Sequence, residues 1–338
     1  MNETIAEFNC FYRRLNRKEN IIYMFFTTGM LFWAIKAISF IPAAVNLILV
    51  CAGMDASEIK WITENWKYPT FFIKEHWNDK QVHQMLFKVN ENSYGWIDCD
   101  CFVLNPVIFD EMTVMDERTS VNVCWASNDK LSNRMLINTY FLFINAKVIR
   151  HMKNLSLNIS PGLYIYPADQ SSGRCYPAKP DVIQPCHMPY ISHFNGSYPK
   201  QFSDDEDDGF FDTLLLFQFV AEGLDYEVKR IRMLGPDHYM SDELLHVGGS
   251  SSFSHFGNKS ESTVIQKYQF DNRIFHMVAY LLLTEFASEL PQAYKKKQML
   301  LRKLYEIDGK SNRMIRSEIA ALFQRNKLST ETVDTLFP

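Results

Sequence analysis

The chain has 338 residues, of which 47% are hydrophobic and 14% aromatic, so it is long enough to bury a large core in one domain or two. A formal net charge of -4 gives no general attraction to nucleic acid, and no nucleic-acid-binding motif is present, so we expect no nucleic-acid partner. The start lacks the pattern of a secretory signal, and seven cysteines without framework spacing favour reduced thiols in the cytoplasm.

The N-terminal part of the chain alternates between apolar runs and amphipathic segments. The apolar stretch 21–53 is interrupted by polar residues and proline, which favours strand, helix and strand over a membrane span. Asp55 opens a capping box with Glu58, and Asn78 or Asp79 begins the next helix. The predicted strands are 21–26, 46–50, 70–73 and 96–98. Strands alternating with helices predict a mostly parallel sheet flanked by helices.

Further along, the apolar runs 121–125 and 139–144 predict two more strands. The regular pattern then ends in a loop-rich insertion at about 160–209, which is rich in Pro, Gly, Ser, Tyr and His. Its last part, 204–208, is a run of acidic residues that is typical of a solvated loop. Long loops of this kind are often functional.

An apolar helix is predicted at 210–222, after the insertion. Asp212 would lie in its first turn, near the positive end of the helix dipole, and Gly223 would be its C-cap. A strand at 226–231 and a compact turn at 246–251 follow. The helix, strand and turn complete a predicted domain that spans residues 1–258.

Residues 259–338 form a predicted helical C-terminal extension. Within it, 294–307 is a basic amphipathic helix in which three consecutive lysines begin the sequence 295–304. Such a helix packs on the neighbouring domain with its lysines in solvent, or lies on anionic lipid. We favour packing on the domain and keep peripheral membrane contact as the alternative.

The most specific chemical pattern is the pair Asp98 and Asp100, separated by one residue at the end of a predicted strand. Two such carboxylates bind a hard divalent cation, Mn²⁺ or Mg²⁺, and leave positions on it for phosphate oxygens. A solvated loop also produces this spacing. Thr27 and Thr28 end the first predicted strand, and the carboxyl ends of parallel strands share one edge of the sheet, so both pairs are expected there.

Three segments, in this order, resemble a GT-A-fold glycosyltransferase, closest in layout to inverting family 2-like enzymes. They are the strand-borne segment 95–100, the apolar segment 138–145, and Asp212 with its apolar helix followed by the His-Val-Gly-Gly-Ser-Ser segment 246–251. The resemblance implies a Rossmann-like α/β fold and metal-dependent transfer of a sugar from a nucleotide-diphosphate donor, a UDP-sugar by default. The acceptor would be a hydroxyl of a glycan, a lipid-linked molecule or a small molecule.

The resemblance also implies roles for particular side chains. Asp98, Asp100 and His246 would hold the metal, and Asp212, with Asp208 as the second candidate, would take the proton from the acceptor hydroxyl. Each has an ordinary structural interpretation as well: a carboxylate at a helix N-terminus, or a histidine that hydrogen-bonds in a turn.

The resemblance implies donor binding by Thr27, Thr28 and Asp55. The sequence departs from the family close to Asp55. The second strand ends in Cys-Ala-Gly at 51–53, where family 2 enzymes commonly place acidic residues, and Asp55 is the nearest substitute. Three alternatives stay open: a retaining transferase of the same fold, a nucleotidyltransferase, and a non-catalytic nucleotide-binding protein. The nucleotidyltransferase normally needs a glycine-rich basic loop after the first strand, and residues 27–30 are a poor version of one.

Overall fold

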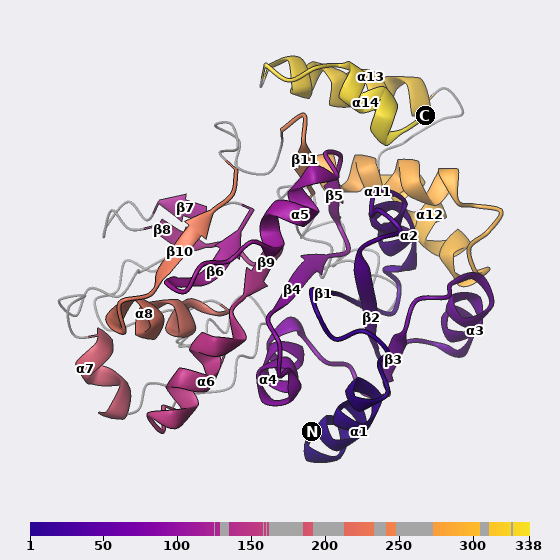
Figure 1. Ribbon diagram of the computed structural model, residues 1–338. Coiled ribbons are helices and arrows are strands. Elements are labelled where there is room, and N and C mark those ends of the chain that lie inside the picture. Colours follow the sequence, from indigo (N-terminus) through magenta and orange to yellow (C-terminus); the bar gives the residue numbers. More distant parts are fainter. Residues whose placement is uncertain are drawn as a thin grey trace, which may run out of the picture.

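The computed structural model describes residues 1–124, 126–128, 135–157, 159, 161, 185–191, 213–232, 241–247, 273–304, 311–325 and 327–338 (Figure 1). Within these, a seven-stranded sheet has the order β10-β6-β9-β4-β1-β2-β3. Its strands are β1 (Ile21–Thr27), β2 (Asn46–Ala52), β3 (Thr70–Ile73), β4 (Tyr94–Asp98), β6 (Thr119–Val123), β9 (Phe141–Ile144) and β10 (Glu227–Arg230). Only β9 runs antiparallel to its neighbours in this sheet. The predicted mostly parallel α/β fold is confirmed.

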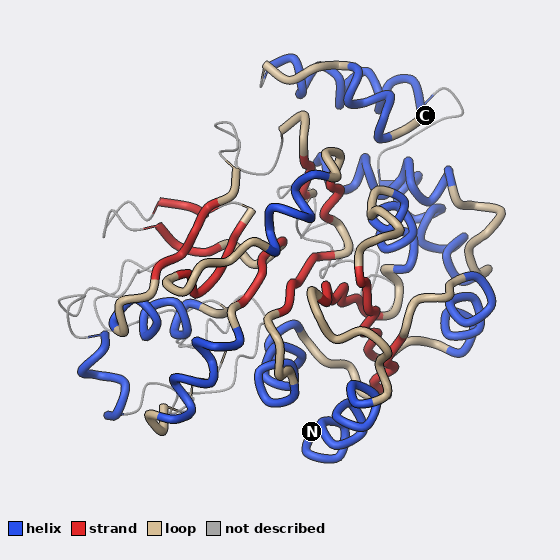
Figure 2. The backbone as a smooth tube through the Cα atoms, viewed as in Figure 1, coloured by secondary structure: helices blue, strands red, loops and turns tan. Residues whose placement is uncertain are grey.

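Both faces of the sheet are buried, as the continuous apolar runs of its strands require. Side chains of β1 alternate between two apolar clusters, with Ile22, Met24 and Phe26 in one, and Ile21 and Tyr23 in the other. One cluster includes α2 (Leu31–Ser39), α5 (Val107–Thr113), α11 (Arg273–Glu285) and α12 (Ala293–Leu304). The other includes α1 (Asn2–Arg13), α4 (Asp79–Val89), α6 (Ala146–Asn154) and α8 (Leu215–Gly223). The helices therefore cover the two faces of the sheet, as the tube drawing shows (Figure 2).

Strand register brings the predicted site residues to one edge. Phe25 of β1 is aligned with Asp98 of β4, and Thr27 is aligned with Ala52 of β2. Because these strands are parallel, their carboxyl ends all open at the same edge of the sheet. Beyond this edge, β5 (Cys101–Val103) pairs with β11 (Leu244–His246) in a small antiparallel sheet.

Local helix signals in the sequence are largely confirmed. Asp55 caps α3 (Ala56–Asn65) in a capping box with Glu58, and Asn78 caps α4 in the same way. Several elements were not predicted individually: α1, α5, α6, α7 (Met188–Ile191), α14 (Glu331–Leu336), the 3₁₀ helix Pro185–His187, and the hairpin of β7 (Ala126–Asn128) and β8 (Met135–Ile137).

The start and end of α8 differ from the prediction. The helix begins at Leu215 because Leu214 before it has a left-handed backbone, with φ +68°, so position 212 precedes the first turn. Gly223 is the last helical residue and not the C-cap. A Cβ at Gly223 would lie 2.0 Å from the carbonyl oxygen of Tyr190 in α7, so glycine is needed here for close packing.

The C-terminal helices pack onto the sheet domain. Lys36 of α2 is buried and forms an ion pair of 2.9 Å with Glu285 of α11, and the indole of Trp61 donates to the carbonyl oxygen of Glu289. α13 (Ser311–Arg325) and α14 follow beyond α11 (Figure 1). The predicted boundary at 258 and most of the insertion 160–209 lie outside the described residues. In the part of the chain that is described, no helix is long and apolar enough to cross a membrane.

Candidate active site

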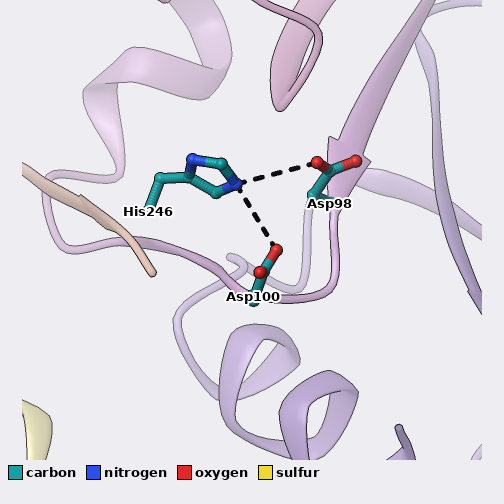
Figure 3. Close-up of side chains that lie close together, drawn as sticks. All are labelled: Asp98, Asp100 and His246. Carbon is teal, nitrogen blue, oxygen red and sulfur yellow. Dashed lines mark ion pairs between the residues drawn. The ribbon is translucent and has the colours of Figure 1, made fainter. Parts of the chain in front are cut away.

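Three side chains from two distant segments of the chain converge at the carboxyl edge of the sheet (Figure 3). Nε2 of His246 lies 3.7 Å from Oδ2 of Asp98 and 3.5 Å from Oδ1 of Asp100. Asp98 ends β4, Asp100 lies in the turn to β5, and His246 ends β11. The sequence predicted this set, although it placed His246 in a turn and not at the end of a strand.

Pairing between β5 and β11 accounts for the approach of His246 to the two carboxylates. His246 is opposite Cys101, the residue that follows Asp100, and the amide of Val247 donates to the carbonyl oxygen of Asp100 at 3.1 Å. The amide of Leu104 extends the pairing by donating to the carbonyl oxygen of Glu243 at 2.8 Å. Backbone bonds on both sides therefore hold the imidazole beside Asp100.

Two aromatic side chains contact the carboxylate of Asp98 and the imidazole of His246. The indole Nε1–H of Trp96 donates to Oδ1 of Asp98 at 2.7 Å, so Oδ2 is the oxygen that faces His246. Tyr140 stacks its ring on the imidazole, with centroids 4.3 Å apart and planes 16° apart. Its carbonyl oxygen accepts the amide of Asp98 at 2.8 Å, so Tyr140 contacts both sides of the site. Neither aromatic residue was singled out from the sequence, because their roles depend on the pairing of β4 with β9.

The three side chains fit a divalent cation. Among the described residues they form a group whose ligand atoms all lie within 4.8 Å of one another. Carboxylate oxygens suit Mg²⁺ and Mn²⁺, and imidazole suits transition metals. A third of the Asp98 side chain is exposed while Asp100 is buried, so the site is open to a ligand from the side of Asp98.

Residues 1–149 match a protein family model described as the StrH glycosyltransferase N-terminal domain. This part of the chain is a glycosyltransferase domain. The match covers less than half of the chain, and it includes β1 to β4, Asp98 and Asp100, but not His246. The expected class, a glycosyltransferase, is confirmed by this match, and the sheet order agrees with the expected mostly parallel α/β fold. A comparison with curated proteins gave no match.

Several solved structures are similar to part of this chain. The crystal structure of HddC from Yersinia pseudotuberculosis has 12% sequence identity and a TM-score of 0.29, over 39% of this chain and 79% of that one. The glycosyltransferase GlyE from Streptococcus pneumoniae TIGR4 has 13% identity and a TM-score of 0.28, over 42% and 41%. Glucosyl-3-phosphoglycerate synthase from Mycobacterium tuberculosis, in complex with phosphoglyceric acid, has 10% identity and a TM-score of 0.28, over 43% and 61%. The chain thus spans less than half of GlyE, and the fold assignment depends on the sheet order.

The charges of Asp98, Asp100 and His246 shift one another's pKa values at this site. Removal from water and the neighbouring charge of Asp100 raise the pKa of Asp98 to about 7. The charge of His246 and the hydrogen bond from Trp96 act in the opposite direction. Burial alone would lower the pKa of His246, but the charge and hydrogen bond of Asp100, together with Asp98, raise it. Two carboxylates this close are stabilised by a positive charge between them.

The predicted donor-binding residues lie at the same edge, and their side chains have partners within the glycosyltransferase domain. The hydroxyl of Thr27 contacts the sulfur of Met30 at 3.5 Å, and the hydroxyl of Thr28 donates to Oε2 of Glu58 at 2.6 Å. Oδ1 of Asp55 accepts the amide of Glu58 at 2.9 Å as part of the helix cap. Glu58, which the sequence identified only as a capping residue, is the partner that Thr28 and Asp55 share.

Other predicted positions lie outside the described residues. These are the two candidates for the base, Asp208 and Asp212, and the segment 248–251 that follows His246. Their roles therefore remain predictions from the sequence. His238 and His255, two other histidines near His246 in the sequence, also lie outside the described part.

Proposed function

We propose that the protein transfers a sugar from a nucleotide-diphosphate sugar to an acceptor hydroxyl, using a divalent cation held by Asp98, Asp100 and His246. The observation that supports this most directly is the convergence of these three side chains at the edge of a glycosyltransferase domain. A cation bound there neutralises the charge that develops on the departing nucleotide diphosphate. Because imidazole is part of the set, we propose Mn²⁺ ahead of Mg²⁺.

The residues around the cation position have distinct proposed roles. Asp100, which is almost fully buried, is the proposed inner ligand. Asp98 would bind the cation through Oδ2 on the open side, while its Oδ1 accepts the hydrogen bond from the indole of Trp96. Orientation of a ligand by an outer hydrogen bond is a general feature of metal sites. Neutral His246 provides the third ligand atom, Nε2.

For the chemical step we propose an inverting transfer with Asp212 as the general base and Asp208 as the second candidate. The base removes the proton of the acceptor hydroxyl as its oxygen attacks the anomeric carbon of the sugar. The proposal rests on the position of Asp212 eleven residues before Gly223 in the sequence. The anomeric configuration of the product, measured by NMR, distinguishes this mechanism from a retaining one.

The donor is proposed to be a UDP-sugar that binds at the edge formed by Thr27, Thr28 and Asp55. The connection from β1 to α2 has only three residues, Thr28 to Met30, and the amide of Gly29 already donates to Glu58 at 2.7 Å. A nucleotidyltransferase needs a longer basic loop with amides free for a triphosphate. This observation favours sugar transfer over nucleotidyl transfer.

The acceptor is proposed to be a glycan, a lipid-linked molecule or a small molecule, and the proposed compartment is the cytoplasm. Free cysteines among the described residues support a reducing compartment. Lys295, Lys296, Met299 and Arg302 form an exposed stripe on α12, which supports peripheral contact with anionic lipid. Cosedimentation with vesicles containing phosphatidylserine tests this contact, and equal cosedimentation of a Lys295→Glu, Lys296→Glu variant would refute it.

Release of nucleoside diphosphate from UDP-, GDP- and dTDP-sugars tests the proposed activity, with Mn²⁺ or EDTA present. We expect metal-dependent release from one nucleotide class by the wild type, and a loss of at least a hundredfold in Asp100→Asn. Asp334→Asn, the same change at an exposed carboxylate of α14, is the matched control and should keep full activity. Release that survives both EDTA and Asp100→Asn would refute the proposal.

A further inference from the structure

Polar groups of the connection between β1 and α2 form hydrogen bonds with residues that are distant in the sequence. Glu58 of α3 accepts the hydroxyl of Thr28 at 2.6 Å and the amide of Gly29 at 2.7 Å. It also accepts the amide of Asp55 at 3.1 Å. Its side chain is 1% exposed, so these donors replace the water that a carboxylate otherwise requires.

Helix α12, from the C-terminal extension, completes this network. The hydroxyl of Tyr294 donates to Oε1 of Glu58 and accepts the amide of Leu31 at 3.0 Å. The ammonium of Lys297 donates to the carbonyl oxygen of Gly29 at 3.3 Å. One turn of α12 therefore contacts the carboxylate of Glu58, the backbone of the loop and the first turn of α2.

The bond from Leu31 replaces an ordinary helix cap. The first amides of a helix have no partner inside the helix, and a side chain at the N-cap usually accepts one of them. Met30 is the N-cap of α2 and makes no side-chain capping bond. Tyr294, more than 260 residues away, supplies the missing acceptor for α2.

The charges in this network depend on one another. Lys297 is attracted by Glu58 and Asp55, although burial outweighs that attraction and lowers the pKa of Lys297 to about 8. Gly29 has φ +85°, a backbone conformation that is rare for other residues and is held here by bonds on both its amide and its carbonyl group. Loss of one donor would leave buried charge on Glu58 and release the loop.

We infer that α12 fixes the shape of the donor-binding loop, and that Tyr294 and Lys297 are positioning residues of the donor site. The inference rests on the proposed function, which places the nucleotide against this edge of the sheet. The Thr28 hydroxyl and Oδ1 of Asp55 already form hydrogen bonds with Glu58. The donor therefore contacts the backbone of the β1–α2 loop, whose shape these bonds hold. The C-terminal extension is then part of the donor site.

The test is the dissociation constant of the nucleotide that the wild type binds among UDP, GDP, dTDP and CMP, measured calorimetrically with Mn²⁺. Tyr294→Phe removes only the hydroxyl, and we expect about tenfold weaker binding, because a hydrogen bond to a buried charge is lost. Tyr280→Phe, on α11 of the same extension, is the control and should bind as the wild type does. Lys297→Met is the second variant, in case Tyr294→Phe does not fold.

A double-mutant cycle with Thr28→Val separates positioning from direct contact. If both hydroxyls act through Glu58, the loss in the double variant is smaller than the product of the single losses. Independent effects, or unchanged binding in folded Tyr294→Phe and Lys297→Met, would overturn the inference while leaving the proposed function intact. A wild type that binds none of the nucleotides would refute the proposed function as well.

Discussion

At the scale of single residues, the site depends on the different partners of the two carboxylate oxygens of Asp98. One oxygen accepts the indole of Trp96 and the other faces His246. Trp96 is itself buried and held by the ring of His83, with centroids 4.1 Å apart. The strand residue two places before Asp98 therefore orients this carboxylate toward His246.

Replacing Trp96 by phenylalanine should weaken Mn²⁺ binding about tenfold, since Asp98 loses the hydrogen bond that orients its carboxylate. Mn²⁺ titration followed by electron paramagnetic resonance measures this affinity directly. Trp61→Phe is the matched control, because it also removes an indole hydrogen bond, to the carbonyl oxygen of Glu289, away from the site. Equal Mn²⁺ affinity in Trp96→Phe and the wild type would contradict the account.

His83 gives the protein a defined sensitivity to acid. Burial lowers the pKa of His83 to about 4, so the folded state keeps it neutral while the unfolded chain takes up a proton below about pH 6.5. Stability is therefore complete above pH 6.5 and decreases as the pH falls toward 4, by about 3 kcal/mol from this residue at the lower limit. Urea unfolding at pH 7, 6 and 5 should show a shallower loss in His83→Leu than in the wild type. Parallel losses would refute the assignment.

At the scale of elements, local signals were sufficient for much of the sheet and for two helix starts. The strands β1 to β4 are continuous apolar runs, and Asp55 forms the predicted capping box within α3. The pairing of β5 with β11 was not predicted, because each strand has three residues and the two lie far apart in the sequence. The three residues of the proposed metal site were nevertheless predicted, Asp98 and Asp100 from their spacing and His246 from the resemblance to family 2-like enzymes.

Roles that depend on tertiary contacts had no signal in the sequence. Glu58 satisfies a capping box, and nothing in that pattern indicates that Tyr294 donates to it. The start of α8 was placed too early because the apolar pattern extends upstream of Leu214, where the backbone is left-handed. Gly223 was explained by helix capping, although the carbonyl group of Tyr190 is what excludes a side chain.

Replacing Gly223 by alanine should destabilise the fold by about 1–3 kcal/mol, because the new methyl group meets backbone and not a flexible side chain. Guanidinium unfolding followed by circular dichroism measures this. Lys60→Ala, at an exposed position of α3, provides the control and should change stability by less than about 0.5 kcal/mol. A stable Gly223→Ala variant would show that α7 and α8 do not pack as described.

At the scale of the whole molecule, the C-terminal helices share one apolar cluster with the sheet. Residues of α11, α12, α13 and α14 pack in the same cluster as α2 and one face of β1. The buried ion pair of Lys36 with Glu285 crosses this boundary. Sheet and extension therefore should unfold together.

Calorimetry should accordingly show a single unfolding transition. Glu285→Gln should lower its midpoint temperature without splitting it in two. The substitution leaves the buried ammonium of Lys36 without its charge partner, and we expect a loss of about 2 kcal/mol, less than for a fully buried pair because Glu285 is 31% exposed. Glu64→Gln, at an exposed ion pair on α3, is the control. Two separate transitions would contradict a shared core.

The most direct test of the proposed metal-dependent donor site is thermal stabilisation by UDP, GDP, dTDP and CMP, each with and without Mn²⁺. A ligand that binds only the folded state raises the melting temperature according to its affinity and concentration. We predict that one nucleotide raises the melting temperature of the wild type only when Mn²⁺ is present, and that Asp100→Asn abolishes the shift. No shift with any nucleotide, or a shift that persists in Asp100→Asn, would contradict the account.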